Sequence, residues 1–104
     1  MKELEIACFD IITNVGTAKS LYHEALSLAK EGDFDGAYKL IEEGEQSFLI
    51  GHKAHAKLVQ KEANGEDLPI KLILIHSEDQ LMGAEQTKEM VIEFIELYKL
   101  ILSK

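Results

Sequence analysis

The 104-residue sequence contains one proline, one cysteine and no tryptophan. A chain so poor in proline is typical of a helical protein with few irregular loops. Cys8 has no second cysteine with which to form an intramolecular disulfide, which fits a reducing cytoplasm. Its apolar helical position predicts buried filler rather than a nucleophile. No apolar run reaches the roughly 18 residues of a membrane helix, and MKELEIACFD lacks a signal-peptide core. We therefore expect a cytoplasmic protein.

Basic residues are also scarce, since 11 Lys and Arg stand against 19 Asp and Glu, for a formal charge of −8. Affinity for nucleic acid comes from neutralising phosphates with Lys and Arg, so this balance argues against a nucleic-acid partner. It also argues against direct binding to an anionic membrane surface. An acidic surface fits basic protein partners or simple solubility.

The apolar content is high, because hydrophobic residues make up 46% of the chain and charged residues 29%. This composition excludes a disordered chain. The length predicts a single domain over residues 1–104.

Two turn signals divide the chain. Gly32 can end one helix and Asp33 can cap the next, while Asp67 can cap a third helix with Pro69 in its first turn. We expect helices over residues 3–30, 34–63 and 68–102, and we find no strand alternation. The predicted fold is all-α, an antiparallel three-helix bundle of the spectrin-repeat kind.

Each predicted helix carries a heptad seam, in which apolar positions alternate spacings of four and three. The first seam is Leu4, Cys8, Ile11, Val15, Ala18, Tyr22, Ala25 and Ala29. The second is Phe34, Ala37, Ile41, Gly44, Phe48, Gly51, His55 and Leu58. The third is Ile73, Ser77, Gln80, Ala84, Thr87, Val91, Phe94, Tyr98 and Ile101.

Many apolar residues lie outside these seams. This is clearest on the third helix, where Leu72, Leu74 and Ile75 extend the apolar surface almost all the way around the helix. A helix that is hydrophobic all round is buried on more than one side. We therefore expect oligomerisation through the third helix, around a symmetry axis. Gly44 and Gly51 each cost about 1 kcal/mol relative to Ala inside a helix, which predicts close approach of another backbone.

The predicted third helix contains the segment LILIHSEDQLMG, in which His76 follows four aliphatic residues and Asp79 follows three positions later. On a helix these two side chains are neighbours. From spacing alone, a structural histidine hydrogen-bonded to Asp79 is favoured over a reactive one. The functional interpretation is a neutral imidazole, a good nucleophile near pH 7 because its usual pKa is about 6.5, with the carboxylate fixing its tautomer. Phosphohistidine is the intermediate that such a group suits best, with Gly83 leaving space above the ring.

Two predictions of a metal site compete with the phosphohistidine interpretation of His76 and Asp79. If the third helix lines an oligomer axis, symmetry-related Asp79 carboxylates converge there and call for a hard cation such as Mg²⁺. His52 and His55, three apart on the second helix, could bind zinc with the His76 and Asp79 pair, although no further close ligand supports this. Apart from the adjacent Glu24, His23 has no acidic or histidine residue at a spacing that would indicate a shared site, so we expect it to lie on the surface.

The chain resembles, almost end to end, the enzyme IIA component of the lactose/cellobiose class of the bacterial sugar phosphotransferase system. The resemblance rests on the segments EALSLAKEGDFDGAYKLIEEGEQSF, EANGEDLPIKLILIHSEDQLM and IELYK. Within them the elements A-x-x-G-D-F-x-x-A and H-x-x-D-x-L-M occur in the right order and at the right separation, and together they are highly specific.

The resemblance implies a homotrimer of three-helix subunits, with phosphate passing from the phosphocarrier protein HPr to a histidine and on to a cysteine of enzyme IIB. Matching H-x-x-D-x-L-M makes His76 the phosphorylated histidine and Asp79 the carboxylate that holds a metal, usually magnesium, at the trimer axis. The membrane is then reached only indirectly, through the permease that the IIB component serves. The implied cargo is a β-linked disaccharide of the lactose, cellobiose or chitobiose class.

Two residues depart from the family pattern. Gln80 stands where a histidine is frequent, and His55 stands where a glutamine is common, so contacts near the axis can differ. Two other functions stay open. One is a non-catalytic helical scaffold that binds partners on its acidic face. The other is a two-component phosphotransfer domain, against which the absence of H-x-x-K-G counts.

Overall fold

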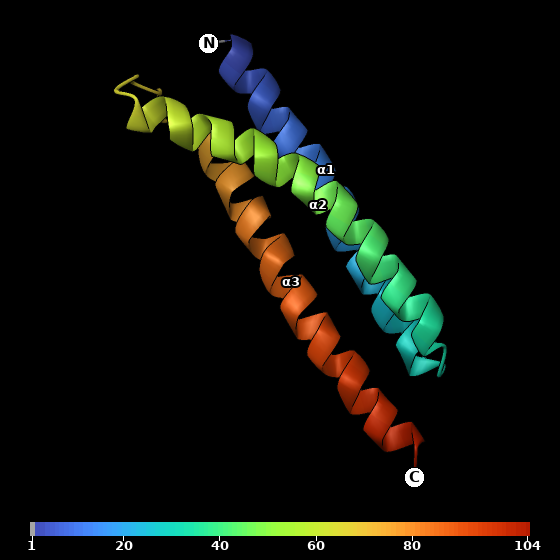
Figure 1. Ribbon diagram of the computed structural model, residues 1–104. Helices are drawn as coiled ribbons and strands as arrows, with labels where there is room; N and C mark the ends of the chain where they lie inside the picture. Colours follow the sequence, from blue (N-terminus) through green and yellow to red (C-terminus); the bar gives the residue numbers. More distant parts are fainter. Residues whose placement is uncertain (1) are drawn as a thin grey trace.

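The computed structural model describes residues 2–104. Within them the chain forms three α-helices and no strand: α1 is Lys2–Lys30, α2 is Phe34–Ala63 and α3 is Leu72–Leu102. The helices run up, down and up in a bundle of 56 × 20 × 17 Å, with the two chain ends at opposite ends of the long axis (Figure 1). The predicted all-α three-helix bundle is confirmed. None of these helices is long and apolar enough to span a membrane.

The turn between α1 and α2 is built as its residues predict. Gly32 adopts a φ of 88°, the left-handed conformation that glycine favours at a helix end. The Asp33 side chain then accepts a hydrogen bond of 3.0 Å from the backbone N–H of Gly36 and caps α2. These two residues hold α1 and α2 antiparallel and side by side.

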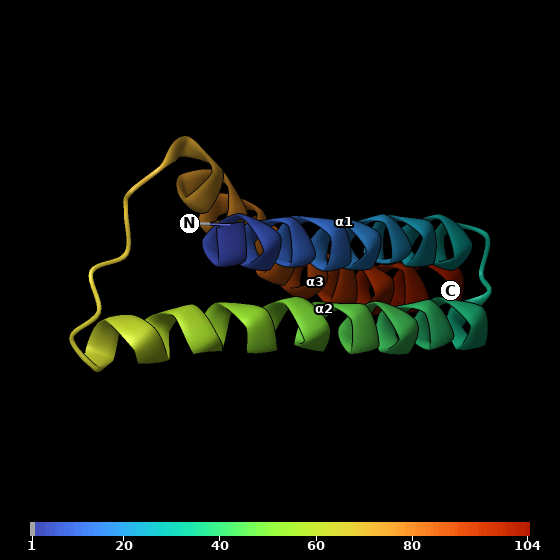
Figure 2. The same cartoon turned by 90° about the horizontal axis from the view of Figure 1, so that it is seen from above.

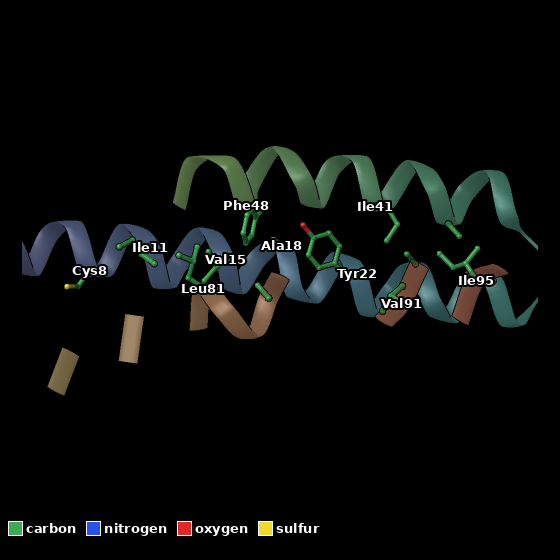
Figure 3. Packing of buried hydrophobic residues seen from close by; sticks show 14 of the residues in the cluster. Cys8, Ile11, Val15, Ala18, Tyr22, Ile41, Phe48, Leu81, Val91 and Ile95 are labelled. Carbon is green, nitrogen blue, oxygen red and sulfur yellow. The ribbon is translucent and has the colours of Figure 1, made fainter. Parts of the chain in front are cut away.

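The core is centred on α1, which packs against both α2 and α3, whereas α2 and α3 have few contacts with each other. All eight residues of the predicted seam of α1 are buried, and Figure 3 shows several of them packed between α2 and α3. The seam of α2 is confirmed apart from Phe34 and His55, which are only half-buried. The bundle is therefore held together chiefly by the apolar face of α1.

Gly44 and Gly51 mark the closest approach of α2 to α1. A Cβ atom added at Gly44 would lie 2.5 Å from Cε1 of Tyr22 and 3.2 Å from the carbonyl oxygen of Ala18. One added at Gly51 would lie 2.7 Å from Cγ1 of Val15. The predicted close approach of another backbone is present, since the carbonyl oxygen of Ile11 would lie 3.5 Å from the Cβ atom added at Gly51, although the nearest atoms at both glycines belong to side chains of α1.

The third helix differs from its prediction in where it begins. It starts at Leu72 rather than residue 68, and its N-cap Lys71 makes no side-chain capping bond. The residue before a proline is driven away from helical dihedrals, so Leu68 cannot continue into a helix through Pro69. Instead the segment from 64 to 71 runs as a long connection that carries α3 away from the end of α2 (Figure 2).

The buried face of α3 is also rotated from its predicted position. Ser77, Ala84 and Val91 are buried as expected, but so are Leu81 and Ile95. Phe94 and Ile101, which were predicted to face the core, are exposed. The face that meets α1 follows positions 77, 81, 84, 88, 91 and 95, and so it includes a lysine, Lys88.

Candidate functional site

His76 lies on the surface, in the second turn of α3, beside an apolar hollow. The hollow has a volume of about 660 Å³ and is lined by His76 with two residues from each of two helices: Phe9, Ile12, Leu72 and Ile73. The imidazole is therefore not the buried structural histidine that spacing alone favoured. It is an exposed ring against an apolar wall, open to a partner that brings a reactive group to it.

Half of this wall comes from α1 and was missed by the sequence analysis. Phe9 is 57% exposed and stands on the outer flank of α1, one turn before Ile12. Ile12 was noted only as an apolar residue outside the seam. An exposed phenylalanine outside the seam was the available signal, but no spacing within one helix shows which part of α3 it faces.

The start of α3 is tied to α1 and to its own first turn. The ammonium of Lys71 lies 3.6 Å from a carboxylate oxygen of Glu5 on α1. Ser77, the buried polar residue next to His76, donates a hydrogen bond of 2.8 Å to the carbonyl oxygen of Leu74. The Lys71–Glu5 ion pair joins the residue before α3 to α1, and the Ser77 hydrogen bond stays within α3, so neither contact uses the imidazole.

Asp79 is exposed and does not orient the His76 ring. In the part of the chain that the structure describes, no hydrogen bond or ion pair joins the two side chains. Asp79 instead lies on the outward face of α3, opposite the core, where Ile75 and Met82 are 54% and 61% exposed. With a rotation of about 100° per residue, Leu97 and Leu100 fall on this same outward face. Asp79 is thus a carboxylate set in an exposed apolar stripe.

The histidines of α2 are engaged elsewhere. His55 contacts the carboxylate of Glu78 on α3, and His52 stacks on Phe48 with ring centroids 6.1 Å apart. Among residues 2–104 no three His, Cys, Asp or Glu side chains gather as a metal site would require. The alternative of a zinc site within one chain is therefore not formed. His55, at the position where the family often has glutamine, connects α2 to the residue next to Asp79.

The sequence was compared with protein families and with curated proteins. Residues 6–99 match the family model described as the lactose/cellobiose-specific IIA subunit of the PTS system. The chain belongs to this family. It is 38% identical over 97 residues to the lactose-specific EIIA component of Staphylococcus epidermidis, a match that covers 93% of each chain.

Solved structures agree with this family in fold. The cellobiose-specific enzyme IIA of Bacillus anthracis superposes with a TM-score of 0.92 at 38% identity, covering 94% of this chain and 90% of that one. A chitobiose IIA solved in complex with HPr superposes with a TM-score of 0.83 at 30% identity, covering 94% of this chain and 95% of that one. The corresponding complex of the Escherichia coli phosphotransferase system gives a TM-score of 0.74 at 29% identity, with the same coverage. The protein is therefore a phosphotransferase component of a sugar phosphotransferase system, built on the fold of its IIA relatives.

Proposed function

We propose that His76 carries the phosphoryl group in this IIA protein, taking it from phosphorylated HPr and passing it to a cysteine of enzyme IIB. The transfer would take place in the cytoplasm and feed the uptake of a β-linked disaccharide of the lactose, cellobiose or chitobiose class. The observation that carries the proposal is the placement of His76, exposed at the rim of the hollow formed by Phe9, Ile12, Leu72 and Ile73. The family relative solved with HPr supports the choice of donor.

The chemistry needs little more than this placement. A neutral ring nitrogen of His76 attacks the phosphorus of the donor phosphohistidine. The new N–P bond forms as the old one breaks, and the bonding pair returns to the donor imidazole. A thiolate of enzyme IIB then attacks the same phosphorus, forming an S–P bond and releasing the His76 ring. Phosphoryl transfer depends chiefly on positioning, and an apolar wall keeps water from the intermediate.

The same proposal includes a homotrimer around the outward face of α3. That face presents Ile75, Met82, Leu97 and Leu100 to solvent, and an apolar stripe on a helix is stabilised when other copies cover it. At the level of Asp79 the outward face of one chain offers that one carboxylate, because Glu93 on the same face lies 14 residues or about 21 Å further along α3. Asp79 therefore suits a metal only when other copies bring theirs. Three such oxygens fit Mg²⁺, a hard cation, whose charge would offset the repulsion among them.

Phosphorylation is tested with purified enzyme I, HPr and phosphoenolpyruvate. The chain should acquire acid-labile phosphate, and His76→Ala should abolish it while His52→Ala and His23→Ala keep it. Phosphate retained by His76→Ala contradicts the assignment of the carrier. Addition of the IIB component should then discharge the label, and a IIB variant that lacks its cysteine should not.

A further inference from the structure

The start of α3, which carries His76, is stabilised only weakly by the helix itself. Lys71, the N-cap residue, makes no side-chain capping bond, and the first turn contains no acidic residue to interact with the helix dipole. Leu72 and Ile75 in that turn are 81% and 54% exposed, so they add little packing within the chain. Since helix ends open more readily than helix interiors, the second turn, with His76, depends on contacts with the other helices.

Two polar contacts between helices lie on either side of His76. The Lys71–Glu5 ion pair precedes it, but these side chains are 43% and 47% exposed, and ion pairs open to solvent add little stability. The other contact joins His55 on α2 to Glu78, two residues after His76, and in it the ring Nε2 donates to Oε1 of the carboxylate. The side chain of His55 is only 18% exposed, so water competes less for this hydrogen bond.

His55 occupies a position of α2 that would suit an apolar residue. It belongs to the seam between Gly51 and Leu58, both of which are buried. A half-buried imidazole is costly at such a position unless its polar atoms are hydrogen-bonded, and Glu78 provides the bond. Glutamine, which the family commonly has at this position, can also donate to a carboxylate. Packing alone therefore does not explain a polar donor here, whereas the bond to Glu78 does.

We infer that His55 is a positioning residue for phosphate transfer: by donating to Glu78 it fixes the second turn of α3 relative to α2, and with it the His76 ring. The assignment rests on the carrier role proposed for His76. Two residues along a helix correspond to a rotation of about 200°, so Glu78 points away from His76 and acts through the helix. Phosphoryl transfer depends on alignment of the attacking nitrogen, and a displacement of about 1 Å can cost up to about a hundredfold in rate.

His55→Leu tests this role without weakening the fold. Leucine suits the seam and replaces the ion pair with apolar packing, so the unfolding free energy should stay equal or rise. The kcat for transfer from phosphorylated HPr, measured by rapid quench, should fall about tenfold, with KM unchanged because the hollow beside His76 is intact. His55→Gln keeps a donor and should stay within about twofold of the unmodified protein. Glu78→Leu should match His55→Leu, and the double variant should lose no more, since both remove one contact.

Lys88→Met is the matched control. It removes the other ion pair between α2 and α3, which lies 12 residues or about 18 Å along α3 from His76. This variant should lower stability and leave kcat unchanged. A second readout needs no phosphate: the ¹⁵N signals of the His76 ring, assigned by their loss in His76→Ala, should broaden or shift in His55→Leu and stay the same in Lys88→Met.

The outcomes separate the positioning role from the carrier function. An unchanged kcat in His55→Leu overturns the positioning role, because the contact is then structural alone. An equal loss of kcat in His55→Leu and Lys88→Met overturns it as well, since any link between α2 and α3 would then serve. If the unmodified chain takes up no phosphate, the proposed function fails and the ring signals decide about the contact: identical His76 signals in the unmodified chain and in His55→Leu overturn it. Circular dichroism verifies that each variant is folded.

Discussion

The ammonium of Lys88 on α3 lies 2.7 Å from Oε1 of Glu45 on α2. The hydroxyl of Tyr22 on α1 lies 3.4 Å from the same oxygen, so one carboxylate joins all three helices in the middle of the bundle. Figure 3 shows the Tyr22 ring buried between the helices, with its oxygen directed toward α2. Neither charged side chain is fully exposed, at 29% for Lys88 and 35% for Glu45. This polar contact fixes α3, and with it His76, relative to α2.

The first prediction concerns the contribution of the Lys88–Glu45 ion pair to the free energy of unfolding. Lys88→Met and Glu45→Gln should each destabilise the chain, and a double-mutant cycle should give a coupling of about 0.5–1.5 kcal/mol in urea unfolding. Lys61 and Glu3 form the matched control, since they are 3.8 Å apart and 42% and 89% exposed. Their coupling should be close to zero because solvent screens exposed pairs. Equal couplings for the two pairs would contradict the role given to Glu45.

The second prediction concerns alkaline pH. Burial, together with the charge and hydrogen bond of Glu45, raises the pKa of Tyr22 well above its usual value. The raised pKa adds stability that is fully present below about pH 10, where an unfolded tyrosine titrates, and is lost as pH rises further. Tyr22→Phe should flatten the fall in unfolding free energy above pH 10. It should also remove the component at highest pH from a tyrosinate absorbance titration, which Tyr38→Phe should leave in place.

The sequence predicted α1 and α2 well because their seams are apolar throughout. All eight seam residues of α1 are buried, and local periodicity was sufficient to identify them. On α3 the predicted seam ran through Thr87 and Phe94, whereas the face toward the core includes Lys88, whose ammonium pairs with Glu45. The carboxylate that pairs with Lys88, and so allows a lysine on the core-facing side of α3, belongs to Glu45 on α2. No pattern within α3 could therefore predict that Lys88 faces the core.

The candidate residues of the site came from a sequence pattern and their roles stay a prediction, whereas their surroundings came only from the structure. H-x-x-D-x-L-M pointed to His76 and Asp79, and the structure finds both exposed on α3. Whether Asp79 contacts the His76 ring depends on the direction of its side chain, which spacing does not determine. In the structure Asp79 lies on the outward face of α3 and makes no contact of this kind. Phe9 and Ile12 complete the hollow only through the packing of α1 on α3, which sequence spacing does not encode.

The third prediction concerns the contact between α1 and α2. Gly44→Ala should destabilise the chain by about 1–3 kcal/mol, because its Cβ atom would lie 2.5 Å from a buried tyrosine ring that has no room to move. Gly16→Ala is the control, and in a chain kept monomeric it should stabilise α1 by about 1 kcal/mol. Thermal and urea unfolding measure both changes. A neutral Gly44→Ala would show that the two helices can separate at no cost.

The last prediction concerns the hollow beside His76. Phe9 presents an exposed ring beside His76, where the phosphate donor of the proposed function would dock, and aromatic anchors contribute much of the binding energy at such interfaces. Phe9→Ala should lower kcat/KM for transfer from phosphorylated HPr by about five- to tenfold, mainly through KM, and change the unfolding free energy by less than about 0.5 kcal/mol. Ile50→Ala is the matched control, because Ile50 is 55% exposed on α2 and Phe9 is 57% exposed. Rapid-quench measurement at several HPr concentrations separates KM from kcat. Equal kinetics for the two variants would mean that the donor reaches His76 without using this wall.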